Sequence, residues 1–593
     1  MDVVWLKRDV RICDHEPLSL AASSGRKFMI LFIYEEEQLQ HDSLHGSHIH
    51  FVNEGIAAFN ERLRSVTGDK DAITTRRGKA TKVLEDLHRS HTIIRLLSHQ
   101  ETGHAASYAC DRQVAAWCRA NGIVWSELPQ SGVVRGLPLG SDWYPVWVSS
   151  LESFLQVDVV EDPFCTDGSH DSLQKLVISE SEGILSPQDL GLSPPRAIDR
   201  PSRQRGGESL GLEILAEFLE KRAENYSGGI SSPNSAWTAC SRLSPYIAWG
   251  HVSIRTIWQA VEARRLTATG KWGRSLSAFL VRLQWRCVYC QRFEMRCWME
   301  KRNICSGWDH LKSGNSIMYD DVKFLGEATE EERLTAFEKG LTGFPMVDAC
   351  MRCLLETGWL NFRMRCMLVS FAVYNLWLDW RCVAGHLARC FLDFEPGIHY
   401  PQLQMQAGTT GVDMRCYSVT RQAKEQDPKG EFIKRYIPEL RSLKAEFVLE
   451  PWKMKPPPPG YPPRIVNETK TSKASKTAMA AFQKQFQSGA STAHFAAPLT
   501  EKLDEDDSNV EPKKVTRSIQ QQLLSTKRAR VCAAESAHAI LEQWTCTRCT
   551  LLNNGSSDLC DACEGPRPHT DKASVDGTVF ESMLMQDTII ELD

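Results

Sequence analysis

The chain has 593 residues, of which 42% are hydrophobic and 17 are tryptophan, so most of it should fold around large cores in two to four domains. Its net charge of −4 excludes a strongly basic protein, so nucleic acid would need a local basic patch. No apolar run reaches the ~18 residues of a membrane span, and the charged start lacks a signal-peptide core.

Residues 1–130 alternate between short apolar runs and more polar segments. The apolar runs are VVWL (3–6), KFMILFIY (27–34), TIIRLLS (92–98) and IVWSEL (123–128). This alternation predicts an α/β domain with a mostly parallel sheet. Residues 131–204 are rich in Gly, Pro, Ser and Asp, and we interpret them as an interdomain connection.

Helical periodicity dominates residues 205–450, which we expect to form a large all-α domain. In FPMVDACMRCLLETGW (344–359) the apolar residues fall on one helical face. The segment MLVSFAVYNLWLDW (367–380) is apolar nearly all round, which is typical of a core helix.

The composition changes at PWKMKPPPPGYPP (451–463), where four consecutive prolines end any helix. Residues 451–541 are then expected to be a disordered linker, because they contain few aromatic and many polar residues. A small module at 542–568 and an acidic tail at 569–593 complete the predicted organisation.

Two CxxC pairs in the module have the spacing of a tetrahedral zinc site. The predicted Zn²⁺ ligands are Cys546, Cys549, Cys560 and Cys563. The 16 other cysteines show no framework spacing, and we expect reduced, buried thiols in the cytosol or nucleus. With a tryptophan two residues before the first ligand and an asparagine four after the second, the module resembles the Ran-binding-protein-type zinc finger. That resemblance leaves RNA, ubiquitin or another protein as its ligand.

Two shorter signals lie beside this module. Lys513 and Lys514, followed twelve residues later by KRAR (527–530), fit a bipartite nuclear-import signal, so we expect a nuclear protein that is also present in the cytoplasm. The segment DTIIELD (587–593) is similar to a SUMO-interacting strand, with an apolar centre and acidic edges.

Polar residues also gather beside the core-forming helices, in LDFEPGIHYPQLQMQAGTTG (392–411). A buried arginine needs an acidic partner, so the sequence predicts that Arg365 pairs with Asp393 within one pocket. The loop before SPYIAWGHVSIR (244–255) carries hydroxyl groups and an arginine, a pattern that favours phosphate binding at a helix N-terminus.

Five segments together resemble the photolyase/cryptochrome flavoprotein family, in the family's order. They are WLKRDVRICDHEPL, SRLSPYIAWGHVSIR, LQWRCVYCQRF, TGFPMVDACMRCLLETGW and DPKGEFIKRYIPEL. The resemblance implies an α/β domain, a helical domain that binds FAD, and an antenna pigment of the folate or deazaflavin type. The implied FAD contacts are Tyr226, Ser241, Arg242, Leu243, Ser244, Arg286, Arg365, Asp393, Glu395 and His399.

The same resemblance implies residues for catalysis and for contact with damaged DNA. The catalytic candidates are His399, near the flavin N5, and the electron-transfer candidates Trp380 and Trp285. The DNA-contact candidates are Arg282, Arg292, Arg363 and Met405. His399 could exchange a proton as the flavin is reduced, or it could be a core histidine bonded to a backbone carbonyl.

The family allows two functions for this chain. One is a light-driven DNA photolyase that passes an electron from reduced FAD to a pyrimidine dimer. The other is a cryptochrome-type blue-light photoreceptor that signals through its C-terminal tail. A scaffold that keeps flavin only for stability is a third reading. We favour repair, with ubiquitin or SUMO as additional partners and no membrane association.

Overall fold

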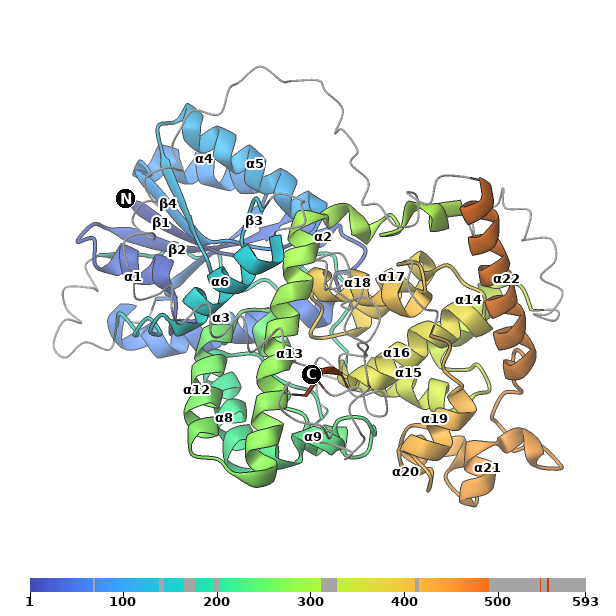
Figure 1. Ribbon diagram of the computed structural model, residues 1–593. Helices are drawn as coiled ribbons and strands as arrows, with labels where there is room; N and C mark the ends of the chain where they lie inside the picture. The colour runs from blue at the N-terminus through green and yellow to red at the C-terminus, as the bar shows by residue number, and fades with distance from the viewer. Residues whose placement is uncertain are drawn as a thin grey trace.

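The computed structural model describes residues 1–67, 70–137, 143–164, 176–196, 200, 202–310, 328–410 and 415–489, together with 544–545 and 552–553. In these residues an N-terminal α/β domain adjoins a larger helical domain (Figure 1). This architecture confirms the predicted fold class. No helix among the described residues is both long and apolar enough to cross a bilayer.

A parallel sheet forms the centre of the N-terminal domain. Its strands follow the order β3-β2-β1-β4-β5, and β6 pairs with β2. Every described pairing in this sheet is parallel. β1 and β2 are buried along their whole length, as expected for strands covered on both faces. The strands are β1 Asp2–Leu6, β2 Phe28–Glu35, β3 Ile73–Gly78, β4 Arg95–His99, β5 Val124–Leu128 and β6 Val177–Ile178.

Helices cover both faces of this sheet, because successive side chains of a strand point to opposite faces. Val3 and Trp5 of β1 belong to the apolar cluster that includes α4 and α5, whereas Val4 and Leu6 belong to the cluster that includes α1, α3 and α6. α6 lies in the stretch that the sequence suggested was only a connection. The helices are α1 Glu16–Ala22, α2 Glu36–Leu39, α3 Gly46–Thr67, α4 Ala80–His91, α5 Ala105–Ala120 and α6 Trp143–Gln156.

The helical domain packs against the sheet domain through a continuous apolar core that contains residues of β1, α3, α12 and α13. The long helix α13 stands between the two domains in Figure 1. The first helices are α8 Glu208–Glu217, α9 Tyr226–Gly229, α10 Ala236–Ala239, α11 Ser244–Ala248, α12 Ile254–Leu266 and α13 Gly270–Met295. The later helices are α14 Glu330–Lys339, α15 Pro345–Thr357, α16 Phe362–Ser370, α17 Trp380–Cys390, α18 Pro396–Ala407, α19 Val419–Gln426, α20 Glu431–Tyr436 and α21 Ala445–Leu449.

The C-terminal boundary of the helical domain differs from the sequence prediction. The predicted linker from residue 451 contains a helix, α22 (Glu468–Gly489), which packs against the helical turn Phe371–Asn375 (Figure 1). Met479 and Phe482 of α22 are buried in the core of the helical domain. Asn375 donates hydrogen bonds to Thr471 and Ser472 at 3.0 and 2.9 Å. The folded domain therefore includes α22.

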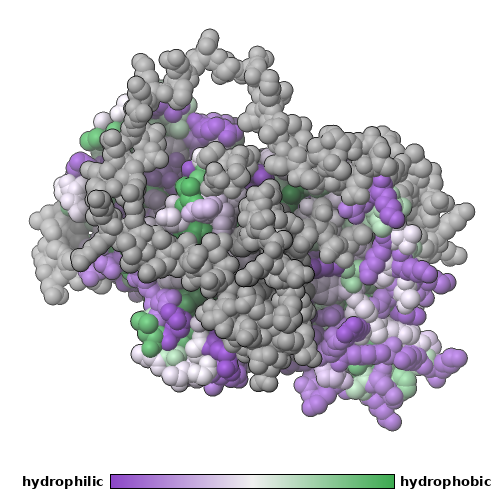
Figure 2. Space-filling view, in the orientation of Figure 1, coloured by the Kyte–Doolittle hydropathy of each residue, from purple (hydrophilic) through white to green (hydrophobic). Residues whose placement is uncertain are grey.

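Beyond α22 the structure describes only β7 (Trp544–Thr545) and β8 (Leu552–Asn553), which pair antiparallel. The four cysteines of the predicted zinc site, the nuclear-import signal and the acidic tail lie outside the described residues. The 14 described cysteines are all free thiols, and most of them are buried. In Figure 2 the described side chains over α19, α20 and α21 are largely hydrophilic, with apolar side chains only in small groups.

Candidate functional site

A cavity of about 920 Å³, partly open to solvent, lies inside the helical domain. It is enclosed by α13, α16, α18, the segment after α17 and the loop before α11. Its wall combines apolar side chains with a few charged and amide groups, the usual composition of a cofactor pocket. The apolar lining is Ile247, Phe279, Leu283, Phe362, Cys366, Val369, Phe391, Phe394, Ile398 and Leu403.

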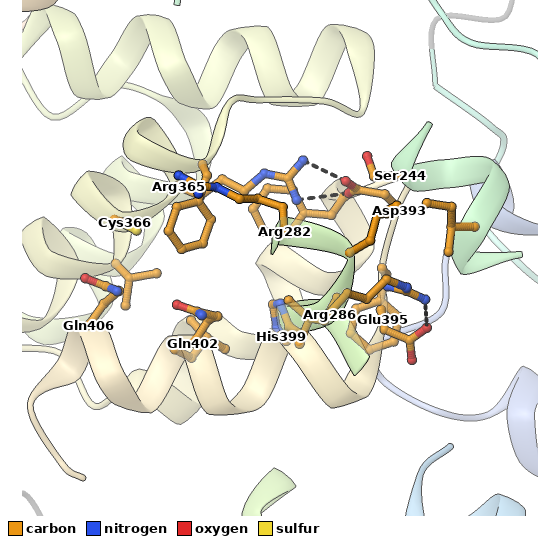
Figure 3. Close-up of a pocket in the computed structure, with 18 of the residues that line it drawn as sticks. Ser244, Arg282, Arg286, Arg365, Cys366, Asp393, Glu395, His399, Gln402 and Gln406 are labelled. Carbon is orange, nitrogen blue, oxygen red and sulfur yellow. Dashed lines mark hydrogen bonds and ion pairs between the residues drawn. The ribbon is translucent and has the colours of Figure 1, made fainter. Parts of the chain in front are cut away.

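The predicted pair of Arg365 and Asp393 forms one charged corner of this cavity. Two parallel hydrogen bonds of 3.0 and 2.8 Å join the guanidinium to the carboxylate (Figure 3). Arg365 also donates to the Leu360 carbonyl at 2.6 Å and stacks 4.2 Å over the Phe391 ring. Burial alone would raise the pKa of Asp393, but Arg365 outweighs it, so the pKa lies below its ordinary value. Asp393 is therefore a carboxylate that fixes Arg365.

A second ion pair joins Arg286 to Glu395 at 2.7 Å and forms another charged corner of the cavity (Figure 3). Burial would lower the pKa of Arg286, but Glu395 raises it above its ordinary value. Arg8 from the sheet domain also approaches Glu395 at 3.8 Å and donates to the Phe394 carbonyl at 2.7 Å. The sequence alone did not indicate Arg8, although it lies in the motif that follows β1. Both domains thus build this corner.

One face of α18 supplies the polar side of the cavity. His399, Gln402 and Gln406 recur at a spacing of three to four residues and project toward Arg365 and Arg282 (Figure 3). Gln406 is 1% exposed, and both of its amide atoms find no hydrogen-bond partner among the described residues. A buried, unsatisfied amide is costly, so this cavity is suited to a polar ligand.

His399 makes the backbone contact of the second alternative, and it also faces the cavity. It lines the cavity, and its Nε2 lies 3.0 Å from the Ala384 carbonyl. Because a carbonyl only accepts, Nε2 carries the proton and Nδ1 keeps its lone pair. Burial lowers the pKa of His399 to about 4. At neutral pH it is therefore an uncharged hydrogen-bond acceptor.

The predicted phosphate loop is only partly exposed to the cavity. Ser241 and Ser244 line it, whereas Leu243 is fully buried in the apolar core. Arg242 adopts a left-handed backbone (φ 66°), and its guanidinium lies between the rings of Trp237 and Trp359 at 4.0 and 3.8 Å. Tyr226 is also a core residue; it packs 5.3 Å from Phe279, a lining residue. Arg242, Leu243 and Tyr226 therefore do not line the cavity but pack behind the residues that do.

The predicted DNA contacts separate into accessible and buried residues. Arg282 lines the cavity and is half-buried, and Arg363 is half-buried nearby on α16. Arg292 and Met405 are each only 7% exposed, so neither is available for surface contact with DNA, contrary to the prediction. Met405 packs on Tyr289 and Trp285 instead.

The electron-transfer candidates do not line the cavity. Trp380 is 2% exposed at the start of α17, and its Nε1 donates to Asn303 at 2.8 Å. It lies one helical turn before Ala384, the residue that accepts from His399. Trp285 is half-buried and packs 6.3 Å from Tyr289. Trp380 thus belongs to the helix that contacts the cavity wall.

A second cavity of about 600 Å³ lies between the two domains and shares Arg286 and Glu395 with the first. Arg8, Gln100 and Gln130 line it, and they follow β1, β4 and β5. The carboxyl ends of parallel strands are the usual place for ligands in α/β domains. The structure therefore has two adjacent cavities, one within the helical domain and one at its border with the sheet.

Two family models match this chain. The model described as DNA photolyase matches residues 2–135, and the model described as the FAD binding domain of DNA photolyase matches residues 279–481. The second match covers most of the cavity lining and extends into α22.

Curated relatives include both repair enzymes and photoreceptors. A deoxyribodipyrimidine photo-lyase of Alkalihalophilus pseudofirmus is 26% identical over 478 residues, 77% of this chain and 90% of that protein. Cryptochrome-2 of Arabidopsis thaliana is 24% identical over 485 residues, 76% of this chain and 72% of that protein.

Solved structures share the fold. A class III photolyase from Agrobacterium tumefaciens superposes with a TM-score of 0.67 at 20% identity, over 82% of this chain and 98% of that chain. An archaeal photolyase from Sulfolobus tokodaii gives a TM-score of 0.61 at 21% identity, over 81% of this chain and 100% of that chain. With both models, the relatives and this fold in agreement, the chain belongs to the photolyase/cryptochrome family.

Proposed function

We propose that this protein is an FAD-dependent DNA photolyase that uses blue light to repair UV-induced pyrimidine dimers. The observation that carries the proposal is the large cavity, in which two ion pairs and an unsatisfied amide surround an apolar interior. The match to the FAD binding domain of DNA photolyase covers these residues.

The cavity fits FAD by its chemistry, because it combines an apolar interior with a few charged, hydroxyl and amide groups. Arg365 and Arg286 would hold the cofactor beside the hydroxyl groups of Ser241 and Ser244, and Gln406 would gain the hydrogen bonds that it lacks in the protein. Bound, reduced and excited by light, FAD supplies an electron that a dimer returns after its bonds break.

The side chains of the protein orient these groups and exclude water. Asp393 holds the Arg365 guanidinium over the Phe391 ring, so the position of Arg365 does not depend on a ligand. His399, uncharged at neutral pH, offers Nδ1 as an acceptor and gives no proton from Nε2, which the Ala384 carbonyl holds. Arg282 places a positive charge in the cavity lining, where it would attract the DNA backbone around a flipped lesion.

The test is repair under controlled light. Protein purified with FAD and reduced is mixed with DNA that carries cyclobutane or (6-4) lesions, and lesions are counted after blue light or darkness. Loss of one lesion type only in light supports the proposal. Arg282→Ala should weaken DNA binding, whereas Arg274→Ala, an exposed arginine eight residues earlier on the same helix, should not. Failure to repair either lesion with FAD bound and reduced contradicts repair.

A cryptochrome-type photoreceptor is the second candidate. The cavity wall formed by Phe362, Cys366 and Leu403 is apolar and offers few hydrogen bonds to the two bases of a flipped dimer. In that case light would change the accessibility of the C-terminal segment rather than repair DNA. Limited proteolysis of the full chain in light and in darkness distinguishes the two: a light-dependent cut beyond residue 489 without repair supports the receptor.

The second cavity is our candidate site for an antenna pigment of the folate or deazaflavin type. It lies at the carboxyl ends of three strands and adjoins the first cavity through Arg286, so a pigment there would be near the flavin. The archaeal relative was solved with two FAD molecules and implicated a light-harvesting cofactor. Release of a second chromophore from purified protein, seen by its absorption, tests this assignment.

We propose further that the C-terminal module is a zinc finger that binds ubiquitin or another protein, in a mainly nuclear protein. The hairpin of β7 and β8 supports the finger, because Cys546 and Cys549 fall between its two strands in the sequence. The basic segments at 513–514 and 527–530 support nuclear import, and the segment 587–593 supports a SUMO partner. Metal content, imaging of a tagged chain and binding to each modifier test these assignments separately.

A further inference from the structure

The sheet of the N-terminal domain ends at β5, which pairs only with β4 among the described strands. Val124, the first residue of β5, is 61% exposed, and the other four residues are half-buried. An edge strand presents unpaired N–H and C=O groups that accept another strand. β5 is therefore an open edge of this sheet.

A groove of about 840 Å³, open to solvent, runs between this edge and α5. Its β5 side is formed by Ile123, Trp125 and Glu127, which alternate and so face the same way. Its α5 side is one helical stripe, with apolar contacts at Ala115 and Cys118. A groove between an edge strand and a helix is the geometry in which an extended peptide adds a strand to a sheet.

The rim of the groove carries positive charge. Arg112 and Arg119 of α5 are exposed there, and neither forms an ion pair with any residue that the structure describes. Arg135, at the end of the groove, is paired with Glu127 at 3.2 Å. A strand that fits this site should have apolar side chains on one face and acidic groups that meet these arginines.

We propose that the groove binds residues 587–593 of this same chain, DTIIELD, as an added strand next to β5. Thr588, Ile590 and Leu592 fall on one face of such a strand, and three acids and Ile589 fall on the other. The uncharged face packs on α5, and the acids meet the rim arginines. The segment is seven residues long, which is enough to pair along all five residues of β5.

The chain is long enough to reach the groove. Roughly 100 residues separate α22 from this segment, and a flexible chain of that length spans about 55 Å on average. A folded domain of this size is about 60 Å across. Tethering gives the segment an effective concentration near the millimolar range, so even a weak strand addition occupies the groove.

The test compares two neighbouring substitutions in the full-length chain. Ile590→Asp puts a charge on the face that packs against α5, whereas Ile589→Asp puts the same charge on the outer face. Hydrogen exchange of the β5 amides reports strand addition. The N–H groups of Val124, Ser126 and Leu128 face β4, so the amides open to an added strand are those of Trp125 and Glu127. We expect exchange at these two amides at least ~10-fold faster in Ile590→Asp than in the wild type, and unchanged in Ile589→Asp.

A second measurement uses a fluorescent DTIIELD peptide added to the full-length Ile590→Asp chain. The peptide should bind to the Ile590→Asp chain. Adding Ala115→Glu within the groove of that chain should weaken the binding at least ~10-fold. The wild-type chain, whose groove is occupied by its own segment, should bind the peptide at least ~10-fold more weakly than the Ile590→Asp chain. The proposal is overturned if exchange is equal in the wild type, Ile590→Asp and Ile589→Asp. It is also overturned if Ala115→Glu leaves peptide binding unchanged. Protection of β5 that appears only when a second protein is added also overturns it.

Discussion

The ion pair of Arg365 with Asp393 gives the sharpest quantitative prediction. Asp393→Asn keeps the shape of the side chain but removes its charge and one of two acceptors. The substituted chain must then hold a guanidinium with no carboxylate in a corner where Asp393 is almost fully buried. The loss is therefore larger than that of an ordinary surface ion pair.

Removing one partner of a buried ion pair costs about 3–5 kcal/mol. We expect the lower end here, about 3 kcal/mol, because Arg365 is partly exposed and keeps its bond to the Leu360 carbonyl. The pKa of Asp393 is lowered in the folded state, so its contribution is fully present above the unfolded value near pH 4 and is lost as pH falls through the lower folded value. The deficit should stay constant between about pH 6 and 8.

The assay is urea unfolding of the FAD-free protein, with FAD content after purification as a second readout. Glu439→Gln is the matched control, because Glu439 pairs with Arg352 at 2.9 Å but is half-buried and lies away from the cavity. That substitution should cost about 1 kcal/mol or less. If Asp393→Asn costs no more than Glu439→Gln, Asp393 does not hold Arg365 as argued here.

Three further predictions concern protonation, the domain boundary and the metal. The pKa of His399 is lowered to about 4, so His399 takes up a proton only below that pH. A pH titration of the bound flavin spectrum should therefore look the same near pH 6.5 in the wild type and in His399→Gln. A chain that ends after residue 467 should lose at least ~3 kcal/mol of stability in urea through the buried Phe482, whereas one that ends after residue 489 should not. Cys546→Ser should remove about one zinc per chain by atomic emission, without shifting the unfolding midpoint of the flavin domain.

The sheet and the main helices could be predicted because burial leaves a periodic signal. β1, β2, β4 and β5 coincide with short apolar runs, and α15 shows an apolar stripe, so these elements were found from the sequence. β3, with the sequence ITTRRG, has no such run and was not found. α22 was missed because its buried face includes Thr471 and Ser475, which are fully buried although polar. Hydrogen bonds from Asn375 satisfy part of this face, and no local pattern reveals a partner about a hundred residues away.

Site residues were found where the chemistry demanded a partner and misjudged where only the family resemblance suggested a contact. The acid that Arg365 needs could be inferred because a buried charge requires one. Arg292 was expected to contact DNA together with Arg282 at the mouth of the pocket, and both residues lie on α13. On a helix, however, ten residues turn about 280°, whereas the four that separate Arg282 from Arg286 turn about 40°. Arg282 and Arg286 therefore share the cavity face, and Arg292 is buried on another.

Arg8 shows why the cavity depends on both domains. It belongs to the sheet domain, yet it donates to the Ala248 and Phe394 carbonyls, stacks on Trp249 and approaches Glu395. The Phe394 carbonyl belongs to the segment that carries Asp393 and Glu395, so docking of the two domains fixes the acids that orient Arg365 and Arg286. Because Arg286 and Glu395 also line the second cavity, a change in domain docking would reach both cavities through the same two side chains.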